Sequence, residues 1–200
     1  MKQLLQLVPA LLFLAACQSN PTTTRPAAVV PPEPTKADTA NLEHIESGTV
    51  TVHGKQQEEL TTKALIRQMG QPDSIAKGAV ECGSELSGLP VDSPDPDIWY
   101  YGKTGYEVSG NRAIMCTFNV ASGKFRGMMG KLVLNQNTTL EDIRRIYPLS
   151  AKQADKPRAG QPDEEMMFLT YYDKDQPLDQ GLVLLFKQGR LQQIDFWSPC

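Results

Sequence analysis

The residues of this chain best suited to covalent chemistry are its four cysteines, at positions 17, 82, 116 and 200. The first of them, Cys17, comes directly after an apolar segment, residues 4–16, and Lys2 precedes that segment. A basic start, an apolar run and small residues at its end are typical of a secretory signal that is cleaved at this point. The run is too short to span a bilayer, which takes about 20 residues. We therefore expect residues 1–16 to be a signal peptide.

The tetrapeptide Leu14-Ala15-Ala16-Cys17 resembles the lipobox of bacterial lipoproteins. The resemblance implies that Cys17 carries acyl chains such as palmitate and becomes the N-terminus of a mature protein held in the membrane by lipid. Several chains anchor a protein stably, whereas one binds only marginally. Gln18 follows the cysteine, and by the sorting rule of enteric-type bacteria this residue implies the outer membrane and a periplasm-facing domain. The inner membrane is the alternative.

The other three cysteines would meet an oxidising envelope, in which we expect one disulfide and one free thiol. Three pairings can be drawn among Cys82, Cys116 and Cys200. We favour Cys82–Cys116, because it would pin a long insertion to the strand that carries Cys116. That bridge would close a loop of about 34 residues and leave Cys200 free.

The remaining candidates for catalysis or metal binding form no motif. The two histidines, His44 and His53, have no ligand set near them in the sequence, which disfavours a zinc site. Ser84 lacks the Gly-x-Ser-x-Gly pattern of a nucleophile elbow. The acidic loops at 92–97 and 173–179 lack the spacing of an EF-hand. We therefore expect a non-enzymatic protein without a metal or other cofactor.

Residues 17–46 have the composition of a disordered tether behind the acylated cysteine. This segment contains five prolines, three consecutive threonines and no aromatic residue, so it buries too little apolar area to fold. The chain carries a net charge of −3 and has no stripe of basic residues. Nucleic acid is therefore disfavoured as a partner, because phosphate contacts need clustered Lys and Arg.

The rest of the chain contains paired segments that occur in the same order twice. Two helices are predicted at 61–69 and 138–146, and Thr138 with Glu141 three residues later predicts a capping box for the second. Each helix is followed by an aromatic strand, at 99–101 and 170–172. Each aromatic strand is followed by an apolar strand, at 114–118 and 182–186. Paired segments of this kind indicate an internal repeat.

The expected fold class is α+β, with two tandem helix-plus-antiparallel-meander units packed into one domain. The first unit would span 47–129 and contain a long insertion at 76–97, and the second would span 130–200. We expect the core to include the apolar residues of both helices and of both apolar strands: Leu65, Ile66, Met69, Ile114, Phe118, Ile143, Ile146, Leu182, Leu184 and Phe186.

Several short motifs resemble one known superfamily. They are Gly70-Gln71-Pro72-Asp73 after the first helix, the strand Trp99-Tyr100-Tyr101-Gly102, and the closing turn Gly189-Arg190-Leu191. The pattern is similar to the superfamily that holds the β-lactamase inhibitor protein and the small lipoprotein of the outer-membrane β-barrel assembly machine. Members of that fold are mainly protein binders. The resemblance implies a lipoprotein that binds another protein as an inhibitor, an immunity factor or an envelope-assembly accessory. The alternatives are a structural envelope lipoprotein without a tight partner and a cell-wall-acting enzyme.

Aromatic residues on the predicted strands supply a candidate protein-binding surface. Alternation along a strand forces one of two consecutive tyrosines to face away from the helices, and outward Tyr and Trp side chains are typical interface hot spots. We expect the outward members of four aromatic residues to line this surface, flanked by the insertion: Trp99, Tyr101, Tyr172 and Trp197. The alternative is that all four belong to the core or cover edge strands.

Overall fold

The computed structural model of this chain describes residues 43, 45–46, 48–156, 159–174 and 176–200. The chain divides into two compact units, residues 1–33 and 34–200, and the first of them lies wholly outside the described residues. The expected signal peptide, Cys17 and most of the expected tether lie outside them too. Within the described ranges, no helix has the length and apolar character needed to cross a membrane.

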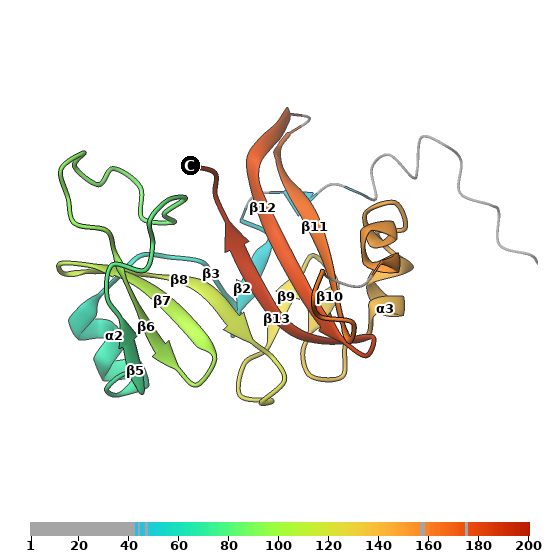
Figure 1. Ribbon diagram of the computed structural model, residues 1–200, viewed down its shortest axis with the longest axis horizontal. Helices are drawn as coiled ribbons and strands as arrows, with labels where there is room; N and C mark the ends of the chain where they lie inside the picture. Colours follow the sequence, from blue (N-terminus) through green and yellow to red (C-terminus); the bar gives the residue numbers. More distant parts are fainter. Residues whose placement is uncertain (1–42, 44, 47, 157–158, 175) are drawn as a thin grey trace, which may run out of the picture. The chain divides into compact units, whose positions relative to one another are not determined.

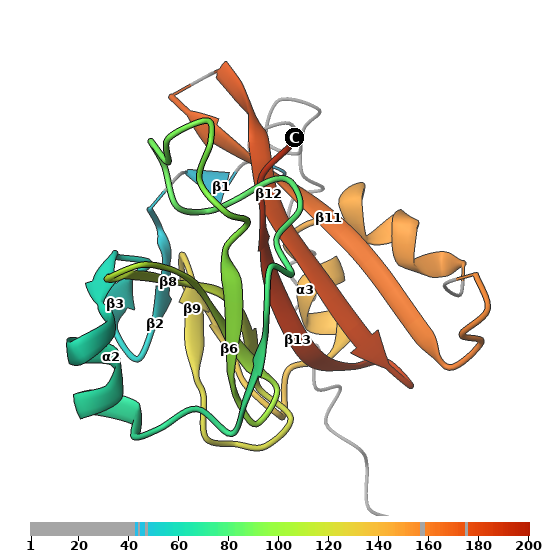
Figure 2. The ribbon, with the colours of Figure 1, turned by 60° about the vertical axis from the view of Figure 1, so that its left-hand side comes forward.

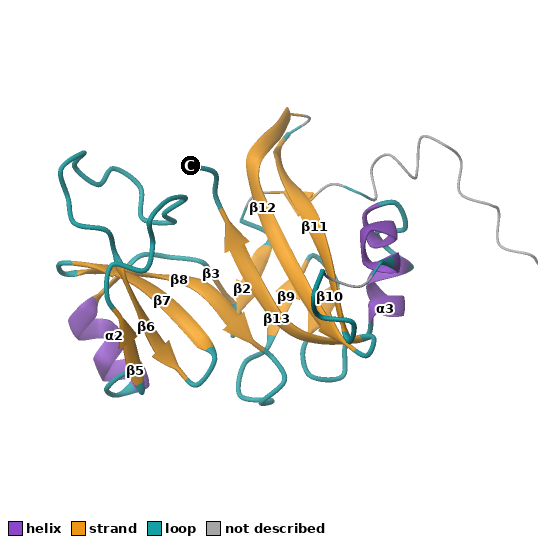
Figure 3. Cartoon of the chain, in the orientation of Figure 1, coloured by secondary structure: helices purple, strands orange, loops and turns teal. Residues whose placement is uncertain are grey.

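Most of the strands belong to one nine-stranded sheet (Figures 1 and 3). Every neighbouring pair in it is antiparallel except β1 and β11, which are parallel. The strands in their order across the sheet are β1 (Ile45–Glu46), β11 (Glu164–Asp173), β12 (Gln176–Lys187), β13 (Arg190–Trp197), β8 (Arg112–Asn119), β7 (Thr104–Ser109), β6 (Asp97–Tyr101) and β5 (Ser74–Ala76), with β4 (Leu60–Thr61) paired to β8.

The described residues also form a second, four-stranded sheet and three helical segments. The second sheet has the order β10 (Leu132–Leu134), β9 (Gly127–Met129), β2 (Val50–Val52) and β3 (Lys55–Gln56). The helical segments are α2 (Thr62–Met69), α3 (Leu140–Arg144) and the 3-10 helix η1 (Ser150–Asp155).

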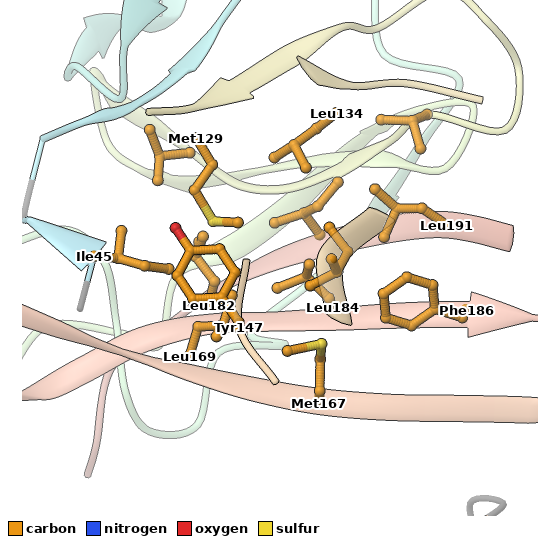
Figure 4. Close-up of a cluster of buried hydrophobic side chains, with 14 of the residues drawn as sticks. Ile45, Met129, Leu134, Tyr147, Met167, Leu169, Leu182, Leu184, Phe186 and Leu191 are labelled. Carbon is orange, nitrogen blue, oxygen red and sulfur yellow. The ribbon is translucent and has the colours of Figure 1, made fainter. Parts of the chain in front are cut away.

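The second sheet and the helices pack on one side of the large sheet, which we call the inner face (Figure 2). The larger buried cluster joins alternate residues of β11, β12 and β13 to the second sheet, α3 and η1. Figure 4 shows part of it, with Leu182, Leu184 and Phe186 of β12 facing Met129 and Leu134 of the second sheet. A smaller cluster lies around Leu65 of α2, and Met69 and Met115 pack against both clusters.

The ends of the helices follow from local chemistry. The Thr61 hydroxyl accepts a hydrogen bond from the backbone N–H of Ala64, and α2 ends at Gly70 with φ of 84°, a backbone conformation that suits glycine. A capping box was expected at the start of α3 and is present there, but it consists of Thr139 and Asp142. The expected box at Thr138 and Glu141 was therefore one residue early.

The predicted α+β fold class is wrong, because the structure is predominantly β, with a mixed nine-stranded sheet and a second sheet. The two helices are short, with 8 residues in α2 and 5 in α3. Strands β1, β2, β3, β9 and β10 have only two or three residues each, which is too short to show a period in the sequence. Pairing of β8 with β13 also joins the two expected meanders into one sheet.

The structure buries six of the predicted core residues: Leu65, Phe118, Ile143, Leu182, Leu184 and Phe186. The other four are only half-buried: Ile66, Met69, Ile114 and Ile146. Ile45 belongs to the segment expected to be a tether, yet only 1% of its surface is exposed, in the larger cluster. The fold therefore includes residues just before the expected boundary at 47.

Candidate functional site

The side of the large sheet opposite to the buried clusters, which we call the outer face, carries an apolar patch over β11, β12 and β13. Alternate residues of these strands, such as Met167 and Leu184, are buried in the inner cluster, so their neighbours point outward. Met166 and Trp197 are 42% and 41% exposed. We define the outer patch as Met166, Phe168, Val183, Leu185 and Trp197, all of which are half-buried or exposed.

The centre of the outer patch is an aromatic pair that spans three strands. The rings of Phe168 on β11 and Trp197 on β13 meet edge to face, with centroids 5.3 Å apart. Gly181 on the intervening strand β12 makes room for the Phe168 ring, because a Cβ atom at this position would lie 2.7 Å from Phe168 Cζ and would also clash with the Leu169 carbonyl oxygen. A glycine in the middle of a strand therefore lets an aromatic ring lie across the sheet.

The four aromatic residues predicted for the binding surface separate into two pairs. Tyr172 is half-buried, with its neighbour Tyr171 buried in the inner cluster, and Trp197 is exposed. Tyr101, by contrast, is 9% exposed and its hydroxyl donates to the Gly70 carbonyl at 3.1 Å. Trp99 packs against the cluster around α2. The outward members are therefore Tyr172 and Trp197.

The insertion covers the outer face over β7, next to the outer patch. Tyr106 and Val108 belong to the cluster around α2, so Glu107 between them points to the outer face. The residue is 4% exposed, and its carboxylate accepts hydrogen bonds from the Ser84 hydroxyl at 2.8 Å and the Glu85 backbone N–H at 2.9 Å. Burial raises the pKa of the Glu107 carboxyl above its usual range, although these hydrogen bonds lower it. Glu107 therefore holds the insertion on the sheet.

The disulfide joins Cys82 to Cys200, with Cα atoms 4.9 Å apart, and Cys116 is free. The favoured Cys82–Cys116 pairing is wrong, because Cys82 lies beside the last residues of the chain. A Cβ atom on Gly83 would clash with the Ser198 carbonyl, and the Ser198 hydroxyl donates to Glu85 at 2.8 Å. The bridge therefore pins the insertion to the segment after β13.

Cys116 has the environment of a structural cysteine. Burial, together with the Glu107 and Asp195 carboxylates, raises the pKa of its thiol to about 12. Because the thiolate is the reactive form, such a cysteine is a poor nucleophile. Within the part of the chain that the structure describes, there is no group of three or more His, Cys, Asp or Glu side chains that could hold a metal ion.

Sequence reasoning missed Phe168 and Met166, because the run Met166-Met167-Phe168-Leu169 is apolar at every position and shows no alternation. The structure shows which side each residue takes, with Met167 and Leu169 buried and Phe168 half-buried. Gly181, a strand position without a side chain, is a sequence signal for a ring that lies across the sheet.

No protein-family model, curated protein or solved structure matches this chain.

Proposed function

We propose that this chain is a membrane-anchored, periplasm-facing lipoprotein that binds another protein through the outer patch and is not an enzyme. The observation that carries the binding role is the Phe168–Trp197 pair, which places two aromatic rings in the middle of an outward sheet face. Large aromatic residues of this kind dominate interface energetics.

The surroundings of the patch fit a binding surface with an apolar centre and a polar border. Asp195 lies beside Val183 in the neighbouring strand and accepts hydrogen bonds from Gln193, at 2.8 Å, and from the Thr117 hydroxyl. An apolar centre with satisfied polar groups at its edge is the usual anatomy of a protein interface. The insertion, held by Glu107 and the disulfide, supplies a fixed wall on the β7 side.

The binding role is tested with the full-length protein as bait in envelope preparations. Phe168→Ala and Trp197→Ala should each weaken capture of the partner by about 30-fold or more, as expected for hot spots of about 2 kcal/mol. Leu149→Ala is the matched control, because it also removes an exposed apolar side chain but outside the outer patch. Leu149 is 54% exposed and lies between α3 and η1. Equal capture by both aromatic variants, the control and the parent protein would reject the outer patch as the binding surface.

The anchoring role depends on Cys17, which lies outside the described residues. Replacing Cys17 with Ser removes the sulfur that would carry the lipid, so the variant should leave the membrane fraction or remain unprocessed. An unchanged, processed membrane fraction for Cys17→Ser would contradict the lipoprotein assignment while leaving the binding test intact.

A further inference from the structure

A cavity of about 180 Å³ lies where the two buried clusters meet on the inner face, on the side of the large sheet opposite to the outer patch. The β2–β3 hairpin, α2 and the inner side of β7 and β8 contribute its walls. Its apolar side consists mainly of Val52, Met69, Tyr106, Met115 and Phe125, and polar residues, among them residues 55–58 and Gln68, line the rest. An apolar cavity of about 150 Å³ can take up benzene, so this one has room for a single aromatic ring.

The walls of this cavity suit an apolar and uncharged ligand. Met69 and Met115 pack against both clusters, and methionine side chains adapt their shape to what they contact. The ring of Phe125 lies 5.4 Å from that of His53. The charged residues of the lining, Lys55 and Glu58, are exposed and opposite in sign, with Nζ and Oε1 3.9 Å apart.

One wall carries a polar group that is available to a ligand. Tyr106 is only 6% exposed and lines the cavity, and its ring meets that of Tyr101 edge to face. The Tyr101 hydroxyl donates to the Gly70 carbonyl, whereas among the described residues the Tyr106 hydroxyl has no such acceptor. Within the described part of the chain, Trp99 Nε1 is the one fully buried side-chain nitrogen or oxygen atom without a partner, so the Tyr106 hydroxyl is not sealed in the core and reaches open space. Burial raises the pKa of Tyr106 to about 12, so the hydroxyl keeps its proton and stays a donor at neutral pH.

We propose that this cavity binds a small, neutral, apolar molecule, about the size of one substituted aromatic ring, that accepts a hydrogen bond from the Tyr106 hydroxyl. Apolar contact with Met69, Met115 and Phe125 supplies the affinity. The Tyr106 hydroxyl supplies the preference for a ligand with a carbonyl or ether oxygen. Sites of this composition, mainly apolar with a few placed polar groups, are typical of small-molecule binding.

Two probes of nearly equal shape test the proposal: acetophenone, which has a carbonyl oxygen, and α-methylstyrene, which has a methylene group in its place. The full-length protein, in lipid nanodiscs so that no detergent competes, is labelled with ¹³C in its methionine methyl groups. Both probes should shift the Met69 and Met115 signals and leave Met166, on the outer patch, unchanged. The Tyr106 hydroxyl should raise the affinity for acetophenone relative to α-methylstyrene about threefold to tenfold, the worth of one hydrogen bond. Affinities are compared at the free concentration of each probe in water, because both probes also dissolve in the lipid.

Tyr106→Phe should lower the affinity for acetophenone by this threefold to tenfold factor and leave the affinity for α-methylstyrene unchanged. The unchanged affinity for α-methylstyrene also shows that the variant is folded. If neither probe shifts the Met69 and Met115 signals more than the Met166 signal, the cavity is not a binding site. If Tyr106→Phe retains the full preference for acetophenone, the hydroxyl does not select the ligand.

Discussion

The rings of Phe168 and Trp197 meet at an interplanar angle of 86° across strand β12, which separates the strands that carry them. The contact couples β11 to β13 on the outer face without a backbone hydrogen bond between them. Because Gly181 lies beneath the Phe168 ring, three strands cooperate to hold one aromatic pair.

The Phe168–Trp197 contact should contribute measurable coupling to stability. A double-mutant cycle of Phe168→Ala and Trp197→Ala, followed by urea unfolding, should give a coupling energy of about 0.5–1.5 kcal/mol. The same cycle between Phe168→Ala and Val91→Ala should give a value within about 0.5 kcal/mol of zero, since the Val91 side chain is fully exposed and lies in the insertion. Equal coupling in both cycles would mean that the aromatic contact does not stabilise the fold.

Gly181→Ala should destabilise the protein by about 1–3 kcal/mol, the usual cost of overpacking. The added methyl group would meet the Leu169 carbonyl and the Phe168 ring, so the ring must move off β12. Gly54→Ala is the control: it has open space around it and φ of 77°, so its cost is backbone strain of about 1 kcal/mol. Chemical denaturation measures both, and a Gly181→Ala variant as stable as the parent would contradict the tight packing.

Removal of the disulfide should destabilise the protein strongly. The bridge spans 118 residues, and closing a loop of about 100 residues is worth up to about 4–5 kcal/mol through the entropy of the unfolded chain. Cys82→Ser and Cys200→Ser should therefore each lower the stability to a similar extent. Cys116→Ser should leave the bridge in place, and peptide mapping without reduction should recover Cys82 linked to Cys200. A peptide that links Cys82 to Cys116 would contradict the structure.

The ionisation of Glu107 should make stability depend on pH in a defined direction. Since burial raises the pKa of Glu107 in the folded state, the folded protein binds this proton more tightly than the unfolded chain does. The stabilisation is complete below the unfolded pKa of about 4.3 and is lost as the pH rises through the folded pKa. Glu107→Gln cannot ionise and keeps an oxygen that accepts from Ser84 and Glu85.

Glu107→Gln should therefore have a higher melting temperature than the parent at pH 7, and the difference should shrink toward pH 4. Thermal unfolding at a series of pH values measures this. Glu58→Gln is the control, because Glu58 is an exposed surface residue. A Glu107→Gln difference that is the same at every pH would show that Glu107 does not ionise differently in the folded state.

The parts of the fold that could be predicted are those set by neighbouring residues. The end of α2 at Gly70 and the hairpin turn at Gly110 and Asn111, between β7 and β8, follow from the backbone preferences of glycine and asparagine. The capping box of α3 was recognised by type and misplaced by one residue, because Thr138 and Thr139 are adjacent candidates.

The parts that could not be predicted depend on contacts between distant segments. The pairing of Ile45 with Tyr171 joins residues far apart in the chain, and strands of two or three residues have no period to detect. Of the five residues of the outer patch, only Trp197 was among the predicted aromatic residues. Trp99 and Tyr101 pack on the inner side instead, because the side on which they lie depends on how β6 pairs in the sheet. The pairing of cysteines likewise depends on the fold and cannot be deduced from spacing.

The order of the cysteines along the chain bears on how the protein acquires its bridge. A ribosome makes Cys82 and Cys116 before Cys200, so the incorrect partner is available to Cys82 before the correct one. The folded sheet resolves this competition, because the Cys116 thiol is then shielded and remains protonated beside Glu107 and Asp195. Oxidation after the sheet has formed therefore favours the Cys82–Cys200 bridge, whereas oxidation before Cys200 is available would join Cys82 to Cys116 and require exchange.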